Sequence, residues 1–225
     1  MDFNIISTGL EKSWDVFKNN AVAYIVGLLI AAIGSCFTFG ILSAPLWYGF
    51  GYMAIKGSRG EKVEIGDVFY GLRTFREFIR SWVYCIVPAL IFLLVGLIAA
   101  FIIIVSTYYL ATISSGIAIA SIFFYFICFL ICALLSIILV PIFFNAIYIY
   151  IMSPSENLMY AYRESFNVLK ANIPMTVAAI LVVYILNAIG SFLCGIGLLI
   201  TTPIAVIFTV SVLKAIRPDL IDNAE

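Results

Sequence analysis

Three long stretches without a charged side chain constrain this chain more than any other feature. They cover residues 19–55, 81–155 and 171–213, and every Lys, Arg, Asp and Glu lies outside them. A membrane-spanning helix needs about 20 apolar residues to cross a hydrocarbon core about 30 Å thick. Each stretch is too long for one such helix and holds turn-forming residues near its middle. Each stretch therefore predicts a helical hairpin.

The overall composition agrees with this interpretation and excludes other classes of protein. Hydrophobic residues make up 64% of the 225 residues and charged residues only 11%, whereas a soluble domain carries about 25% charged residues. The formal net charge is +0 and the chain has no histidine. The lack of a basic excess argues against nucleic-acid binding, and mechanisms that use histidine are excluded. We therefore expect an all-α integral membrane protein.

The three hairpins predict six transmembrane helices. Because a hairpin returns to the side that it left, all charged segments lie on one face of the membrane. Short loops rich in Lys and Arg mark the cytoplasmic side, so we expect a protein of the cell membrane with both termini in the cytoplasm. The expected spans are residues 20–37, 41–57, 82–109, 116–151, 173–193 and 197–215.

The chain also contains an internal repeat. Residues 10–20 align with residues 162–172, with identical Ser, Val, Lys and Asn at four positions, and the middle block is a weaker copy. Since each unit begins and ends on the same side, the repeats are expected to be parallel and related by an axis along the membrane normal. Within a single membrane domain, the expected units are residues 1–60, 61–155 and 156–218, followed by a polar tail, 219–225.

An amphipathic helix is predicted before each hairpin. Such helices lie in the membrane interface with basic residues toward the head groups; alternatively, they pack beneath the bundle without touching lipid. In the second helix Arg73, Arg76 and Arg80 lie off the apolar stripe. The three apolar stripes are Phe3, Ile6, Leu10, Trp14 and Phe17; Val68, Leu72, Phe75, Ile79 and Trp82; and Leu158, Tyr162, Phe166 and Leu169.

Apart from Lys56 and Lys214 at the ends of two expected spans, the predicted crossings contain no Asp, Glu, Lys, Arg or His, which argues against an ion-coupled transporter and against hydrolysis within the membrane. We therefore expect no catalytic residue, metal or cofactor. Asn145 and Asn187 are the polar candidates inside the crossings. Each either forms an interhelical hydrogen bond or belongs to a polar binding site.

Small residues and prolines indicate how the helices pack. Small residues four apart let helices approach closely, either within the chain or between copies of it. Prolines are candidate kink positions. Cys36 and Cys194, near predicted outer hairpin tips, either remain small buried thiols or form a disulfide. The packing candidates are Gly27, Ala31, Ser35, Gly96, Ala100, Gly116 and Ala120, and the kink candidates are Pro88, Pro141 and Pro203.

Several short motifs resemble a known group of membrane proteins. They are the Ser-Trp-Asp-Val-Phe-Lys-Asn-Asn segment 13–20, the segments 40–45 and 56–61, and the Gly-Asp-Val-Phe segment 66–69. The pattern is similar to the archaeal and bacterial multi-pass family of unknown function numbered 4013. It also resembles the membrane domain of some glycerophosphoryl diester phosphodiesterases. The resemblance implies a topology, and since the soluble catalytic domain of those enzymes is absent, it transfers no activity.

These observations favour a non-catalytic membrane protein that acts as a scaffold or accessory component. Its expected partners are the lipid bilayer and either further copies of itself or other membrane proteins. The first alternative is a channel or transporter for neutral or lipidic cargo. The second is a lipid-modifying enzyme at the cytoplasmic interface. Its candidate groups would be Glu61, Glu64, Asp67, Arg73 and Arg76.

Overall fold

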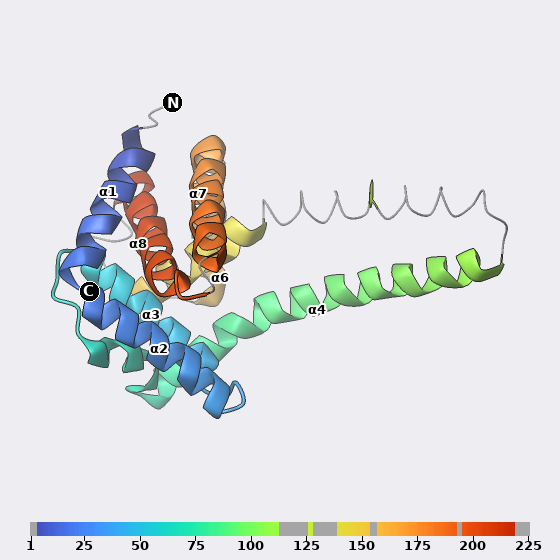
Figure 1. Ribbon diagram of the computed structural model, residues 1–225, viewed down its shortest axis with the longest axis horizontal. Helices are drawn as coiled ribbons and strands as arrows, with labels where there is room; N and C mark the ends of the chain where they lie inside the picture. Colours follow the sequence, from blue (N-terminus) through green and yellow to red (C-terminus); the bar gives the residue numbers. More distant parts are fainter. Residues whose placement is uncertain (1–3, 113–125, 128–138, 154–156, 193–194, 219–225) are drawn as a thin grey trace. The chain divides into compact units, whose positions relative to one another are not determined.

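The computed structural model describes residues 4–112, 126–127, 139–153, 157–192 and 195–218. Within these ranges the regular elements are all helical, as predicted (Figure 1). An apolar helix without a label covers Leu139–Met152. The labelled elements are α1 (Asn4–Asn19), α2 (Ala21–Phe37), α3 (Ser43–Ser58), the 3-10 helix η1 (Ile65–Leu72), α4 (Phe75–Thr112), α6 (Leu158–Ala171), α7 (Ile173–Phe192) and α8 (Leu198–Ile216).

Three of the described helices are long and apolar enough to cross a membrane. They are the Phe75–Val105 part of α4, α7 and α8. The pair α1 and α2 meets the same criterion only when taken together, and it is bent by 86°. At 17 and 16 residues, α2 and α3 are each shorter than the usual span of about 20. Most of the expected span 116–151 lies outside the described residues.

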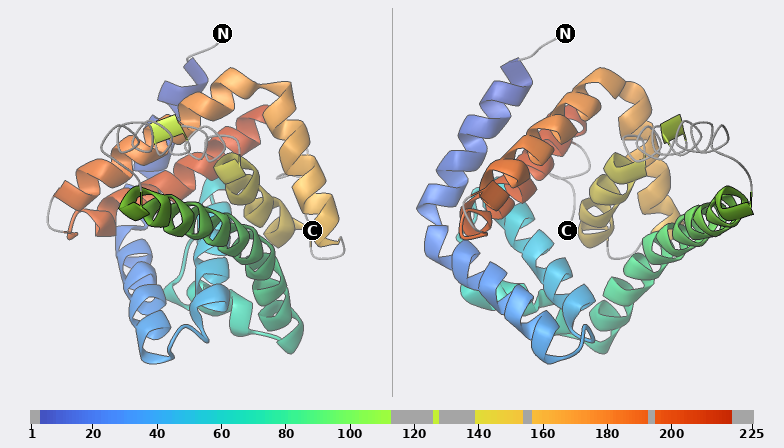
Figure 2. Two further views of the ribbon diagram at one scale, coloured as in Figure 1. Left: turned by 90° about the vertical axis from the view of Figure 1, so that its right-hand side faces the viewer. Right: turned by 45° about the vertical axis from the view of Figure 1, so that its right-hand side comes forward.

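The chain divides into two units, Met1–Tyr84 with Pro141–Glu225, and Cys85–Val140. In the first unit α3 packs against α2, η1 and α8, while α8 also contacts α1 and α7 (Figure 2). The core is therefore built around α3 and α8. Its largest fully buried side chains include Tyr24, Phe50, Met53, Ile207 and Phe208.

Glycine permits the close contact between α3 and η1. A Cβ atom at Gly49 would overlap the carbonyl oxygen of Val68, and one at Gly71 would overlap that of Pro45. Each element thus presents a glycine to the other's backbone. Any larger residue at Gly49 or Gly71 would force the two elements apart.

The second predicted amphipathic helix is not a single element, which corrects the sequence-based expectation. Its stripe is divided between η1, which ends at Leu72, and α4, which begins at Phe75. The backbone N–H of Glu77 donates to Thr74 Oγ1 (3.3 Å), so Thr74 caps a new helix between the two halves. As a result, Arg80 and the apolar span of α4 belong to one continuous helix.

The first amphipathic helix forms as α1, but its protein-facing side differs from the predicted stripe. Gly9, Ser13 and Phe17 are buried, whereas Leu10 and Trp14 are exposed. The small residue at position 9 brings α1 close to α8, so that Phe17 is buried while Leu10 and Trp14 of the predicted stripe stay exposed. The exposed Leu10 and Trp14 are typical of a helix that lies in a membrane interface.

Candidate functional site

A buried carboxylate fixes the segment between α3 and α4. Asp67 Oδ2 accepts hydrogen bonds from Lys56 Nζ (2.9 Å) and from the backbone N–H of Glu64 (2.9 Å). Arg73 Nη2 lies 3.6 Å from Asp67 Oδ1. The Glu64 side chain accepts the backbone N–H of Asp67, which completes a capping box at the start of η1. The oxygens of Asp67 are therefore engaged in holding the chain.

A second buried charge, Arg80, connects α4 to the helix Leu139–Met152. Its Nη2 donates to the carbonyl oxygens of Tyr150 (2.6 Å) and Ser153 (3.2 Å). The guanidinium also lies over the Tyr150 ring, 4.3 Å from the centroid, and Nη1 is 3.9 Å from Glu77 Oε1. Such contacts offset part of the desolvation cost of a buried cation.

Aromatic rings extend these contacts through the first unit. Tyr52 and Tyr70 stack with centroids 4.0 Å apart, and burial raises the pKa of Tyr70, with the charge of Glu77 adding to the effect. The rings continue from Tyr70 to Tyr48, Tyr150, Tyr84, Tyr162 and Phe143, each centroid within 6.4 Å of the preceding ring. The cluster joins all three expected repeat units. These aromatic side chains therefore have a role in packing.

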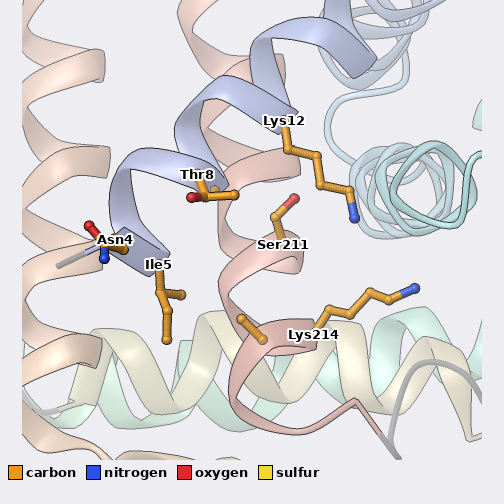
Figure 3. Close-up of a pocket in the computed structure, with 8 residues that line it drawn as sticks. Asn4, Ile5, Thr8, Lys12, Ser211 and Lys214 are labelled. Carbon is orange, nitrogen blue, oxygen red and sulfur yellow. The ribbon is translucent and has the colours of Figure 1, made fainter. Parts of the chain in front are cut away.

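A pocket of about 370 Å³ lies between α1 and α8. Lys12 from α1 and Lys214 from α8 reach the same side of α8, with Ser211 between them (Figure 3). Ser211 is buried, and its hydroxyl has no hydrogen-bond partner within the described residues. The pocket is lined by Asn4, Ile5, Thr8, Gly9, Lys12, Ser211, Lys214 and Ala215.

Asn145 and Asn187, the two polar residues predicted inside the crossings, lie outside this pocket. Asn145 is buried in the helix Leu139–Met152, and Asn187 is half-buried in α7. The backbone carbonyl of Asn187 accepts the hydroxyl of Ser191 (2.8 Å). Neither asparagine lines the α1–α8 pocket.

The small-residue candidates occupy different environments. A Cβ at Gly27 would lie 2.9 Å from Met53 Cε, so Gly27 marks the contact of α2 with α3. Ala31 is fully buried, and Ser35 Oγ donates to its carbonyl (2.6 Å). Gly96 and Ala100 are exposed on α4. Gly116, Ala120 and Cys194 lie outside the described residues.

The proline and remaining cysteine candidates are placed as follows. Pro88 and Pro203 lie inside α4 and α8, and Pro141 lies inside Leu139–Met152. Each of these helices continues beyond its proline. Cys36 is an exposed free thiol. The described part of the chain holds no group of three metal-ligating side chains.

Sequence reasoning missed the buried role of Arg80 and the presence of Lys12 and Lys214 in the lining of one pocket. A signal for Arg80 was available, because it directly precedes the longest charge-free stretch. The lysines lie far apart in sequence on different helices, so only the packing of α1 against α8 brings them together.

Comparison with known proteins gives no further assignment. No family model, curated protein or solved structure matches this chain.

Proposed function

We propose that this protein is a non-catalytic, multi-pass component of the cell membrane that acts as an assembly scaffold. The observation that carries the proposal is the apolar span Phe75–Val105 of α4, in which none of the most apolar window is buried among the described residues. By contrast, half of the corresponding window of α8 is buried. Within the described residues, α4 therefore presents an apolar surface suited to lipid, to its expected hairpin partner and to other membrane helices.

The buried charges support a structural rather than a catalytic role. Asp67 is held by Lys56, Arg73 and a backbone N–H, and Arg80 binds two carbonyl groups of its own chain. A general acid or base must reach the atom of a substrate with which it exchanges a proton. These groups instead connect segments of the first unit, which favours the scaffold over the lipid-modifying enzyme.

The proposal includes the finer topology derived from the sequence. Six crossings in three parallel hairpins would place both termini in the cytoplasm, in line with the family resemblance described above. Positions 9, 13 and 17 of α1 and the aligned positions 161, 165 and 169 of α6 are all buried. This shared burial pattern supports the alignment of the first repeat, which contains α1, with the third repeat, which contains α6.

The mass of the purified protein in mild detergent tests the proposal. We expect a stable homo-oligomer or a complex with a co-purifying membrane protein, measured by light scattering and native mass spectrometry. Ala100→Leu enlarges an exposed small residue of α4 and should dissociate the complex. Ala188→Leu makes the same change at an exposed position of α7 and should leave it intact.

A monomer without a partner would overturn the scaffold proposal. If that monomer also supported flux of a neutral dye or lipid in liposomes, the transport alternative would replace it. Equal dissociation by both leucine variants would remove α4 as the assembly surface.

A further inference from the structure

We infer that the pocket between α1 and α8 binds a phosphate group, in particular the phosphate of an anionic phospholipid at the cytoplasmic surface. Lys12 and Lys214 line this pocket, and its lining in the described part of the chain includes no carboxylate. Lysine is a common phosphate-binding residue because its ammonium acts as a compact positive charge. The inference rests on the membrane topology of the proposed function, but it concerns a different part of the molecule from α4 and does not depend on assembly through α4.

Close helix packing creates the pocket. A Cβ at Gly9 would lie 3.3 Å from Phe208 Cε2 and 3.7 Å from Val212 Cγ2, so α1 approaches α8 closely at this point. This contact places Lys12 beside Lys214, although the two residues are far apart in the sequence (Figure 3). A volume of about 370 Å³ falls within the range of small-ligand sites.

Ser211 supplies the second observation that points to a ligand. It is 7% exposed, and its hydroxyl has no hydrogen-bond partner in the described part of the chain. An unpaired buried hydroxyl is unfavourable. Rotation about its Cα–Cβ bond would direct the hydroxyl toward a phosphate oxygen held by the two lysines.

The position of the pocket favours a lipid phosphate. Lys214 lies in the last turn of α8, which is apolar enough to span a membrane. A lysine at the end of such a helix lies at the level of the head groups. The exposed Leu10 and Trp14 of α1 would rest in the same interface, while Ile5 and Ala215 provide apolar lining for the glycerol region.

Titration of the purified full-length protein tests this inference. Short-chain phosphatidylglycerol should raise the unfolding temperature saturably and form a 1:1 adduct in native mass spectrometry, whereas phosphatidylcholine should not. Lys12→Ala/Lys214→Ala should increase the half-saturating phosphatidylglycerol concentration at least ten-fold. Lys18→Ala/Lys62→Ala removes two exposed lysines outside the pocket and should leave it unchanged.

Two further arms complete the experiment. Ser211→Ala should weaken binding several-fold without lowering the unfolding temperature of the lipid-free protein, because it removes an unpartnered hydroxyl. Inorganic phosphate, compared with chloride at equal ionic strength, shows whether the site also binds the free anion or only the phosphate of a lipid. A saturable phosphate effect that is lost in Lys12→Ala/Lys214→Ala supports a phosphate site open to the free anion as well. No saturable effect of either ligand, or an equal loss in both lysine pairs, would overturn the inference.

Discussion

At the scale of single residues, Arg80 shows how this fold accommodates a charge that the sequence places beside a long apolar stretch. Removing a guanidinium from water is costly. The cost is offset by two carbonyl groups, the Tyr150 ring and the nearby Glu77. Tyr150 and Ser153 are about 70 residues away in sequence, so this charge fixes a long-range contact.

Replacing Arg80 tests this role. Arg80→Ala should lower the free energy of unfolding by about 3 kcal/mol or more, because Glu77 and two carbonyl groups lose a buried partner. Chemical denaturation followed by tryptophan fluorescence in detergent would measure the change. Lys62→Ala, which removes an exposed cation of the loop after α3, is the control, with an expected change within about 0.5 kcal/mol. Equal effects of the two substitutions would contradict the structural role of Arg80.

At the scale of elements, the contact between α3 and η1 depends on two glycines, which have no side chain to keep the backbones apart. Gly49 and Gly71 each meet the backbone of the opposite element, which allows Asp67 on η1 to reach Lys56 on α3. The ion pair and the glycines are therefore parts of one arrangement. The expected amphipathic helix through Val68 and Trp82 is interrupted because the capping box of Glu64 and Asp67 and the cap at Thr74 start two separate helices.

Alanine substitution separates packing from backbone flexibility at this contact. Gly49→Ala should destabilise the protein by about 3 kcal/mol, since the added methyl group meets the Val68 carbonyl and overpacking is costly. Gly66→Ala should be tolerated within about 1 kcal/mol, because nothing lies within 4 Å of its added Cβ and its φ angle is outside the positive range. Thermal unfolding would compare the two variants, and similar stability of both would refute the proposed close contact.

At the scale of the whole molecule, the proposed orientation follows from where the charges lie. Cys36 lies in the last turn of α2, whereas Glu61 lies in the charged loop after α3. Both positions are exposed. In the proposed topology they lie on opposite sides of the membrane, which makes them suitable reporters.

Cysteine labelling in intact cells tests this orientation. In a variant with the other four cysteines replaced by alanine, a membrane-impermeant maleimide should label Cys36 from outside. When Cys36 is also replaced, Glu61→Cys should react only after the membrane is permeabilised. Labelling of Glu61→Cys in intact cells would overturn the assigned orientation, and equal labelling of both positions from outside would exclude a crossing between them.

The sequence by itself determined the helical class and the presence of helices long and apolar enough to span a membrane, because hydropathy and charge spacing act locally along the chain. The apolar content of α4, α7 and α8 can be recognised without knowing what surrounds them. Tertiary structure decided which face of α1 is buried, how Arg80 is satisfied and that Lys12 and Lys214 line the same pocket. Each of these depends on contacts between residues distant in sequence, and the periodicity of a single helix carries no information about its neighbour.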